Sequence, residues 1–402
     1  MIPFWEKKGN SVEFNNYLFT DEFLPSIGFL YNQTTQTVVK TTDINKLVYD
    51  IKNEDNLVSY IGDFIKNTNS KEFEEGGRFH VDDVSKKMVL TGWFQKGHIL
   101  ISTFFKYRES LPKFKLSNMF RDTHTSCYMS FQNGIVHITG KEIKLIDFKV
   151  CGNKYRMSNQ LVQRVNTKET TGFNGKIKLD KKSSNPLIHY SGNETESLFK
   201  SITSIPKDKK KHRGLQVGKD KPIYGEDFVY NESGYKCLMS SVGYLLHKKN
   251  PTTNKLMLYQ DRYITKGQRN GGNGKGLIWR VLQKCTPLVE VQCDKIQNEG
   301  SQRFHLSDVN LGTRVVVYDE VPPLGQKFDL QKIYSTITGS VQVDRKGKDS
   351  FTLKDDDCPK LLGTTNYIVF DKDSTSDMRR LHITELSNIG SFHKEKINES
   401  WG

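Results

Sequence analysis

The sequence predicts an α/β protein with a central parallel sheet in its C-terminal part and an α+β domain before it. Residues 313–318 are rich in β-branched side chains, and residues 361–363 form a second short apolar run. Such runs are typical of strands buried on both faces of a parallel sheet. A third apolar run, at 256–259, leads into a glycine-rich segment, and apolar residues spaced for one helix face follow at 277–282. Strand, loop and helix in this order predict the start of an α/β core.

Three segments are expected along the 402 residues, a length with room for two or three domains. Residues 1–195 are predicted to form an N-terminal α+β accessory domain. Residues 196–250 are predicted to form a basic linker followed by a helical segment, because 205–222 is rich in Lys and Gly and nearly without large apolar side chains. Residues 251–402 then form the domain with the parallel sheet.

Within the first segment, the pattern predicts a helix at 44–51 capped by Asp43 and a second helix at 57–65. Short apolar runs separated by turn residues predict strands from about residue 86 onward. The pair Asn133-Gly134 lies between two alternating stretches and predicts a β-hairpin. None of these stretches points to chemistry, so we expect a role in DNA binding or oligomerisation.

Charge and cysteine usage narrow the class of partner and the compartment. The chain has 60 Lys and Arg against 46 Asp and Glu, a net charge of +14. Such an excess favours a polyanion such as nucleic acid, although it also suits a merely basic surface. The six cysteines form no C-x-x-C pair, which predicts reduced thiols in a cytoplasmic protein, of the host cell if the protein is viral. No apolar run reaches the ~18 to 20 residues of a membrane span, so no membrane association is expected.

The glycine-rich segment predicts a site for phosphate. Glycines let successive backbone N–H groups face one anion, the helix that follows adds partial positive charge, and Lys275 can reach terminal phosphates. The segment departs from the usual G-x-x-x-x-G-K-[ST] pattern, because Arg269 replaces the first glycine and Gly276 replaces the hydroxyl residue that binds magnesium. A bland surface loop is the alternative. The predicted cradle is Gly271, Gly272, Asn273, Gly274, Lys275 and Gly276.

Polar residues follow both predicted central strands. Asp319 and Glu320 come directly after the run 313–318, and ligands of open α/β sheets bind at the carboxyl ends of strands. Asp319 is predicted to hold magnesium and Glu320 to polarise an attacking water, although a strand can also simply end in acidic residues. Thr364, Thr365 and Asn366 follow the run 361–363. The Asn366 amide can orient the water and sense the terminal phosphate.

Basic residues recur in two further places. Two alternating stretches surround Arg345-Lys346-Gly347-Lys348, which predicts a hairpin with a basic tip. Tips of this kind concentrate positive charge on a strand backbone without reading its sequence. Later in the chain comes the pair Arg379-Arg380. An arginine supplied across a subunit interface can neutralise charge on a transferred phosphoryl group.

Taken together, these motifs resemble the superfamily 3 helicases, the AAA+ ring motors of small DNA viruses, phages and plasmids. The likeness is greatest to the phage and satellite-phage primase-helicase type. In that family a G-G-N-G-K loop, an acidic strand end, a basic hairpin, a strand ending in T-T-N and an R-R pair occur in the same order. The likeness covers about residues 255–385. It implies an AAA+ P-loop NTPase core with ATP and Mg²⁺ as cofactors.

By this resemblance each motif takes a role. Lys275 binds the β- and γ-phosphates, Asp319 holds Mg²⁺ and Glu320 is the catalytic carboxylate. Asn366 is the sensor, and Arg380 or Arg379 is the arginine finger. Arg345, Lys346 and Lys348 form the hairpin that grips single-stranded DNA.

The resulting prediction is an ATP-dependent DNA helicase that acts as a homo-oligomeric, hexameric ring on single-stranded or forked DNA during phage or mobile-element replication. Two alternatives stay open. One is a replication initiator that binds ATP and DNA but hydrolyses ATP weakly, which Gly276 favours. The other is a packaging or integration ATPase built on the same core.

Overall fold

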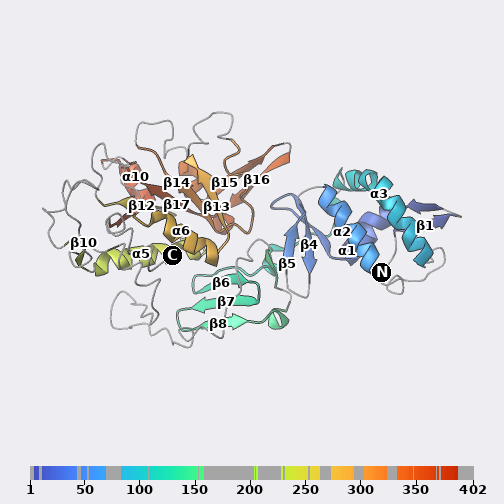
Figure 1. Cartoon of the computed structure of the whole chain (residues 1–402), viewed down its shortest axis with the longest axis horizontal. Coiled ribbons are helices and arrows are strands. Elements are labelled where there is room, and N and C mark those ends of the chain that lie inside the picture. Colours follow the sequence, from blue (N-terminus) through green and yellow to red (C-terminus); the bar gives the residue numbers. More distant parts are fainter. Residues whose placement is uncertain are drawn as a thin grey trace, which may run out of the picture. The chain divides into compact units, whose positions relative to one another are not determined.

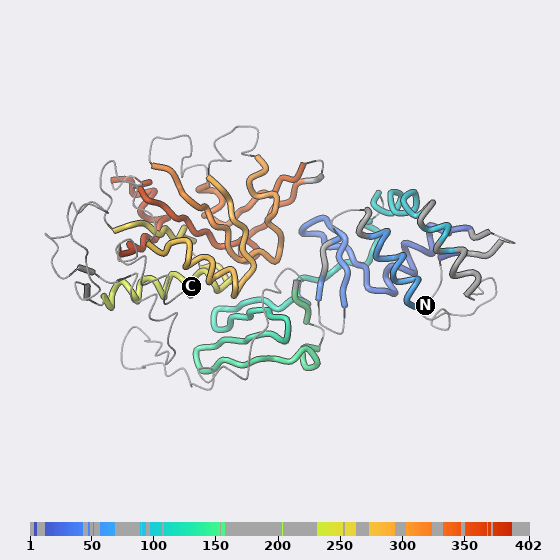
Figure 2. The backbone as a smooth tube through the Cα atoms, in the orientation of Figure 1, coloured from blue at the N-terminus to red at the C-terminus, as the bar shows by residue number. Residues whose placement is uncertain are grey.

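The computed structural model divides the chain into two compact units, which are described separately (Figures 1 and 2). The first comprises Met1–Phe120 and Phe148–Ser158, and the second comprises Arg121–Asp147 and Asn159–Gly402. Residues 121–147, expected in the N-terminal domain, thus belong to the second unit. The structure describes residues 4–8, 11–42, 47–51, 54–68, 83–106, 108–152, 154–157, 203, 205–206, 228–229, 231–251, 254–262, 273–293, 303–323, 333–346, 348–367, 369–370 and 373–387.

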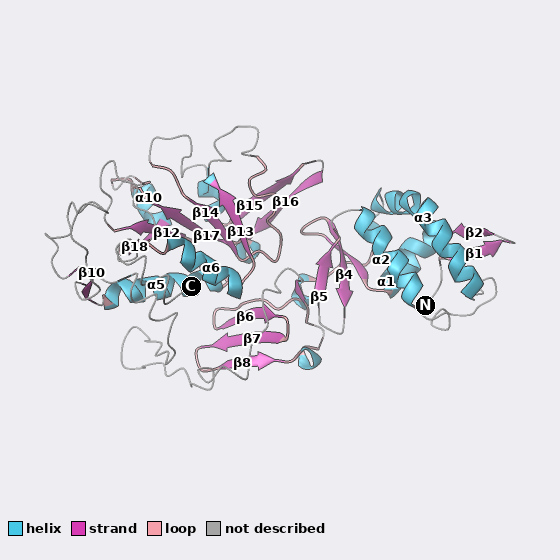
Figure 3. Cartoon of the chain, viewed as in Figure 1, coloured by secondary structure: helices cyan, strands magenta, loops and turns pink. Residues whose placement is uncertain are grey.

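The first unit mixes helices with small sheets, in which all strand pairs are antiparallel except β5–β9 (Figure 3). β1 and β2 form a two-stranded sheet, and β3, β4, β5 and β9 form a four-stranded one. The strands are β1 (Trp5–Lys8), β2 (Ser11–Phe14), β3 (Phe29–Asn32), β4 (Thr37–Thr42), β5 (Leu47–Asp50) and β9 (Arg156–Met157). The helices are α1 (Leu24–Ser26), α2 (Glu54–Asn67) and α3 (Asp83–Lys106), with a π-helical turn at Leu18–Phe23 before α1.

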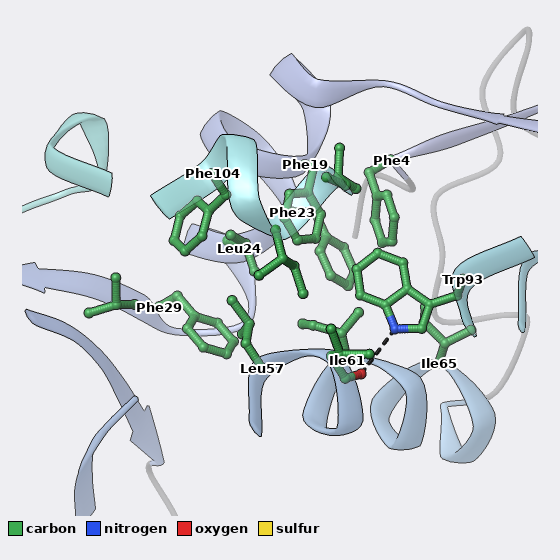
Figure 4. Close-up of a cluster of buried hydrophobic side chains, with 14 of the residues drawn as sticks. Phe4, Phe19, Phe23, Leu24, Phe29, Leu57, Ile61, Ile65, Trp93 and Phe104 are labelled. Atoms are coloured by element: carbon green, nitrogen blue, oxygen red, sulfur yellow. Dashed lines mark hydrogen bonds between the residues drawn. The ribbon is translucent and has the colours of Figure 1, made fainter. Parts of the chain in front are cut away.

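An aromatic core around Trp93 holds this unit together (Figure 4). The Trp93 ring lies 5.6 Å from the Phe4 ring and 5.8 Å from the Phe19 ring, centroid to centroid. Its indole N–H donates to the Val58 carbonyl of α2 at 3.0 Å, so the buried donor is satisfied. Gly97 lies one turn further along α3, and a Cβ there would come within 2.9 Å of the Trp93 ring. The helix therefore needs glycine at this position to seat the ring.

Of the expectations for the predicted N-terminal domain, two are wrong and two are confirmed. The segment 47–50 is strand β5, paired with β4 and β9, and not part of a helix. The stretch from 83 to 106 is the single helix α3, although its Val, Ile and Phe content favours strands. Its buried residues (Val89, Trp93, Gly97, Leu100, Ile101, Phe104) lie at spacings that place them on one helix face, so tertiary packing overrides local propensity. Helix α2 is present, and so is the hairpin at residues 126–139, which belongs to the second unit.

A five-stranded sheet forms the centre of the second unit, and every neighbouring pair in it is parallel. The strand order is β13-β14-β17-β12-β18. The predicted parallel sheet is thus confirmed, together with the helices on either side of the 256–261 strand. The elements are β12 (Leu256–Asp261), β13 (Leu288–Gln292), β14 (Val315–Asp319), β17 (Lys360–Thr365), β18 (Leu381–Leu386), α5 (Glu232–Leu246) and α6 (Lys275–Cys285).

Helices α5 and α6 cover one face of this sheet (Figure 1). Met257 and Tyr259 of β12 point into their shared core, where the Tyr259 hydroxyl lies 2.8 Å from the Ser241 hydroxyl of α5. Because side chains alternate along a strand, Asp261 points to the same face as Tyr259. The sheet therefore aims the last residue of β12 toward the beginning of α6.

Smaller elements surround the parallel sheet. β6 (Ser126–Phe131), β7 (Gly134–Thr139) and β8 (Ile143–Ile146) form an antiparallel sheet in which Phe131 pairs with Gly134, so the hairpin turn is at residues 132–133. β15 (Ser340–Arg345) and β16 (Lys348–Lys354) form the predicted second hairpin. Further elements of this unit are α9 (Tyr334–Ile337), α10 (Thr375–Arg380), β10 (Ile205–Pro206), β11 (Phe228–Val229) and the 3-10 turn η9 (Asp355–Asp357).

A buried ion pair fastens the β6–β8 sheet to the parallel sheet. The Arg314 guanidinium, directly before β14, donates to the Asp122 carboxylate at 2.9 Å and to the Leu246 carbonyl at 2.9 Å. It also donates to the Tyr128 carbonyl of β6. One side chain thus connects three elements. Among the described residues, no helix is long and apolar enough to cross a membrane.

Candidate functional site

The carboxyl ends of the five parallel strands lie at one edge of the sheet, where α/β proteins usually bind ligands. At this edge β12 ends at Asp261, β14 ends at Asp319 and β17 ends at Thr365. Helix α6 begins at Lys275 beside the same edge, as its contact with Asp261 shows. The described part of the predicted phosphate cradle therefore lies beside the same edge as Asp319.

Gly274 sets the start of α6. Its φ of 86° lies in the left-handed region, which a residue with a Cβ adopts only with strain. Its carbonyl accepts from the N–H groups of Leu277 and Ile278, so the helix begins at once after it. Asn273 before it is buried. Gly271 and Gly272 lie outside the described residues, so the predicted cradle is seen from Asn273 onward.

Lys275 forms an ion pair that the sequence did not predict. Its ammonium lies 2.5 Å from Oδ1 of Asp261, and both side chains are largely removed from solvent, at 11% and 1% exposure. The second carboxylate oxygen of Asp261, Oδ2, is buried and has no hydrogen-bond partner in the described part of the chain. The available signal was an acidic residue two positions after an apolar run, a pattern close to the one that identified Asp319.

Thr364 connects the two acidic residues at the end of β14. Its hydroxyl donates to Oδ1 of Asp319 at 2.5 Å and accepts from the backbone N–H of Glu320 at 3.1 Å. The Thr364 carbonyl also accepts from the Val321 N–H at 2.8 Å. Thr364 therefore fixes both the Asp319 carboxylate and the backbone that carries Glu320. The T-T-N motif drew attention to Asn366, and this role of Thr364 was missed.

Glu320 has an unusual backbone. Its φ of 55° is left-handed, a conformation that is uncommon for residues other than glycine and occurs often at functional sites. Its side chain is exposed. The turn thus directs the carboxylate away from the core while Asp319 stays half-buried beside Thr364.

Asn366 follows β17 at the same edge. Its side chain is half-buried, and its Oδ1 has no hydrogen-bond partner within the described ranges. A buried polar atom without a partner costs free energy and is typical of a place where a water or ligand binds. The position thus suits the predicted sensor, one strand away from both Asp261 and Asp319.

The register places these groups on one face. Tyr318 pairs with Gly363, so Asp319 lies opposite Thr364, and Thr364 pairs with Tyr259. Asp261 is two residues beyond Tyr259 and points to the same side. The carboxylates of Asp261 and Asp319 therefore share the face that α6 covers, with Thr364 between their strands.

The Arg379-Arg380 pair lies at the opposite edge. Helix α10 ends at Arg380, directly before β18 begins at Leu381, and Leu381 pairs with Leu256 at the start of β12. Six-residue strands separate the two edges by roughly 16 Å. Arg379 is exposed, whereas Arg380 donates to the Ser376 carbonyl at 3.1 Å and stacks 4.6 Å from the Tyr334 ring centre. Neither arginine meets Lys275 of the same chain.

The basic hairpin divides into two kinds of residue. Arg345 donates to the carbonyls of Ser307 and Val309, at 3.2 and 3.1 Å, and lies 4.8 Å from the Phe351 ring centre. Lys346 at the tip is exposed. The side chain of Lys348 lies outside the described residues. Arg345 thus attaches the hairpin to residues 307–309, and Lys346 is the described tip residue with an exposed charged side chain.

Magnesium ligation rests on few groups here. No group of three or more His, Cys, Asp or Glu side chains suits a metal within the described parts of the chain. Asp319 supplies a hard carboxylate oxygen of the kind Mg²⁺ prefers, and substrate phosphates and water usually complete such a site. Gly276 supplies no hydroxyl, and a Cβ there would meet only Trp279 Nε1, at 3.8 Å. Space for a serine is therefore present.

Comparison with known proteins gives a family match over part of the chain and structural matches with low TM-scores. Residues 268–380 match the model of a family of unknown function, DUF5906, which is less than half of the chain. The apo A form of the NrS-1 C-terminal region has a TM-score of 0.41 at 10% identity, over 94% of this chain and 65% of that one. A second structure of that region has a TM-score of 0.28 at 13% identity, over 66% and 61%. This chain thus spans about two thirds of the length of those structures. No curated protein matches.

Proposed function

We propose that this protein is an ATP-driven DNA helicase, a ring-forming translocase on single-stranded or forked DNA in phage or mobile-element replication. The proposal includes an AAA+ type of P-loop core, which the five-stranded parallel sheet is compatible with. Its main support is one observation. Lys275, Asp319, Glu320, Thr364 and Asn366 gather at the carboxyl edge of a single parallel sheet.

The residues at that edge suit phosphoryl transfer to water. The Lys275 ammonium would contact the terminal phosphates, since it stands in the first turn of α6 after the left-handed Gly274. The exposed Glu320 carboxylate would accept a proton from the attacking water. The unpartnered Oδ1 of Asn366 would orient that water by accepting a hydrogen bond from its other O–H group. Each group then performs one step within reach of the same strand ends.

ATP and Mg²⁺ fit the side chains present. Asp319, held by the Thr364 hydroxyl, would ligate Mg²⁺, which neutralises charge on the phosphates when bound. Because Gly276 has no hydroxyl, water would take the coordination position that a Ser or Thr at this place usually fills. The chain's own contribution is to hold Asp319 in a fixed orientation through Thr364, and this orientation needs no ligand to form.

The positions of the two arginines support the proposed ring. Because Arg379 and Arg380 lie at the opposite sheet edge from Lys275, an arginine finger at either position would act on the site of a neighbouring subunit. A hexameric ring would place the amino edge of one subunit against the carboxyl edge of the next. Lys346 at the hairpin tip would then face the strand backbone, and the net charge of +14 favours the same partner.

The test is ATP hydrolysis by the full chain, with and without single-stranded DNA, and displacement of a strand from forked DNA. Wild type should hydrolyse ATP faster when DNA is added, and Lys275→Ala should lose at least ~100-fold in rate if one charged contact of the transition state is removed. Glu320→Gln should bind ATP but fail to turn it over. Equal rates in wild type and Lys275→Ala would refute the proposal.

Gly276 favours a second candidate, a replication initiator that binds ATP and DNA but hydrolyses ATP weakly. Without the hydroxyl at position 276, magnesium would be held less firmly and turnover would be slow. Turnover well above background that disappears in Glu320→Gln would exclude it. Tight ATP-dependent DNA binding with no strand displacement would favour it instead.

A further inference from the structure

We infer that the Asp261 carboxylate competes with nucleotide phosphates for the Lys275 ammonium. A nucleotide must therefore displace this carboxylate from Lys275 in order to bind. The inference rests on the proposed function, because it concerns the same site, and it assigns a role to a residue that no sequence motif identified. Its ligand class is a nucleoside di- or triphosphate, whose β- or γ-phosphate reaches Lys275.

The contact is built into the fold. Asp261 is the last residue of β12, whose six residues are all buried, and its side chain is 1% exposed. Lys275 is the first residue of α6, which packs on the same face of the sheet. The 2.5 Å distance between Lys275 Nζ and Asp261 Oδ1 thus joins two rigid elements. Neither side chain can leave the pair by a simple motion of a surface loop.

Asp261 is poorly placed to be a magnesium ligand together with Asp319. Their strands are separated by β17, and Asp261 lies two residues further along, so their Cα atoms are roughly 12 Å apart. Side chains on one face of a sheet stand roughly parallel. Two oxygens on one Mg²⁺ lie within about 4 Å of each other, since each bond is about 2 Å. The register therefore favours the counter-ion role.

The unsatisfied Oδ2 of Asp261 makes the carboxylate a strong partner for the lysine. A buried charge is stable only when it is paired, and this one has a single ion-pair contact in the described part of the chain. A polyphosphate that approaches Lys275 meets a lysine whose charge is already neutralised, beside a carboxylate that repels it. Only a ligand with several negative charges and several contacts can displace or share the lysine.

The sign of the expected effect separates this role from a structural one. If Asp261 merely orients Lys275, its removal weakens nucleotide binding. If Asp261 competes, Asp261→Asn keeps the shape and the acceptor oxygen but removes the charge, and ATP should bind on the order of tenfold more tightly, within the range of typical coupling between sites. ADP should gain similarly. AMP, which has no β-phosphate, should not gain.

The experiment measures dissociation constants of ATP, ADP and AMP by calorimetry, on the full chain, with Mg²⁺ and with chelator. The variants are Asp261→Asn, Lys275→Ala and the double variant. Asp356→Asn is the matched control, because it removes one charge from another Lys–Asp pair, Lys249 with Asp356 at 2.6 Å. That pair lies near the amino ends of β12 and β17, away from the site.

Tightening in Asp261→Asn that is absent from Asp356→Asn, and absent when Lys275 is already alanine, is the expected result. Unchanged or weaker ATP binding in Asp261→Asn overturns the inference while the proposed function stands, provided that Lys275→Ala loses binding. Tightening that persists in the double variant also overturns it, because the lysine is then not the group competed for. Normal ATP binding by Lys275→Ala refutes the proposed function itself.

Thermal unfolding of the same variants gives an independent readout. Lys275→Ala leaves Asp261 buried without its cation, so its melting temperature should fall below that of wild type. Adding Asp261→Asn to Lys275→Ala should restore part of that loss. No restoration would show that the two side chains are not coupled.

Discussion

The Thr364 hydroxyl donates a 2.5 Å hydrogen bond to the Asp319 carboxylate and accepts one from the Glu320 N–H. One side chain on β17 thus fixes the Asp319 carboxylate at the end of β14 and the backbone of Glu320 after it. Because the two strands pair directly, this bridge exists before any ligand binds. The orientation of the acidic pair therefore depends on a neighbouring strand as much as on its own.

Thr364→Val tests that bridge. Valine keeps the shape of threonine but neither donates to Asp319 nor accepts from Glu320, so both lose their orientation. We expect ATP turnover and Mg²⁺ affinity to fall by about 10- to 100-fold, the usual effect of removing a residue that supports a metal ligand. Thr364→Ser keeps the hydroxyl and should retain most activity. Equal loss in both variants would point to packing and not to the hydrogen bonds.

Gly276→Ser should restore the missing magnesium ligand. A Cβ at 276 meets only Trp279 Nε1, at 3.8 Å, so the side chain fits without strain. The midpoint of the Mg²⁺ dependence of ATP hydrolysis should shift to lower concentration, by about three- to tenfold if roughly 1 kcal/mol of ligation is gained. Gly276→Ala is the control, since it adds the Cβ without the hydroxyl. A similar shift in both variants would contradict the ligand role.

Mixing subunits distinguishes the two arginines. Arg379 is exposed, so Arg379→Ala should fold normally and, if it is the finger, should reduce the ATPase rate of wild-type neighbours in mixed oligomers. Arg380 donates to Ser376 and stacks on Tyr334, so Arg380→Ala should also lower thermal stability. Mixed with Lys275→Ala, which keeps both arginines, the finger variant should regain part of the ATPase rate, and no regain with either arginine variant would argue against action between subunits.

Short-range patterns predicted much of this protein, and long-range contacts account for what they missed. The strands β14 and β17, the helix α6 and the hairpin β15–β16 follow from apolar runs and turn residues that are adjacent in sequence. Helix α3 was missed because Val, Ile and Phe favour strands, and only packing around Trp93 shows which of them share a face.

The candidate site likewise combines residues that short-range patterns predicted with contacts that those patterns missed. Lys275, Asp319, Glu320 and Asn366 were found by motif, and the parallel sheet places them at one edge. The acidic end of β12 was a local signal, but the partner of Lys275 is 14 residues away on another element, so no local pattern paired Asp261 with Lys275. Arg345 was expected at the DNA surface because it is basic and near a turn. Its bonds to Ser307 and Val309 depend on how a distant segment packs.

The Asp122–Arg314 pair gives a prediction about acid stability. Burial by itself would raise the pKa of Asp122, but the Arg314 guanidinium, with the N–H groups of Lys248 and Tyr128, holds that pKa below its usual value. A lowered pKa stabilises the fold above the unfolded-state pKa of about 3.9, and this stability is lost as the pH falls through the folded-state pKa. Wild type should therefore weaken steadily below about pH 4.

Arg314→Met should reverse that trend. Without the guanidinium, burial dominates and the pKa of Asp122 rises, so the variant loses stability as the pH increases. The loss relative to wild type should be about 3 to 5 kcal/mol at pH 7 and smaller at pH 4, by urea unfolding. Arg121→Met, which breaks the more exposed pair with Asp357, should cost no more than about 1 kcal/mol. A loss in Arg314→Met that is independent of pH would contradict this account.

Lys360 should make the stability of the wild type rise with pH on the alkaline side as well. Burial at the start of β17 lowers its pKa to about 8, although Asp356 and Asp122 partly oppose the shift. Its ammonium donates to the Lys249 carbonyl at 3.2 Å and lies 4.2 Å from the Tyr244 ring centre. Because the folded state releases this proton more readily than the unfolded state, the charged lysine destabilises the fold below pH 8. That penalty disappears as the pH rises from about 8 toward the unfolded-state pKa of about 10.4.

Lys360→Met separates this effect from that of the buried thiols of Cys127 and Cys358. Burial raises the pKa of both thiols to about 12, so their contribution to the free energy of unfolding falls over the same alkaline pH range. Relative to wild type, Lys360→Met should be more favourable at pH 7 than at pH 10, by about 1 to 3 kcal/mol in the free energy of unfolding. Lys249→Met is the control, since its ammonium is more exposed and pairs with Asp356. The same pH dependence in both variants would show that the shared contacts with η9 (Asp355–Asp357), and not the burial of Lys360, set the alkaline stability.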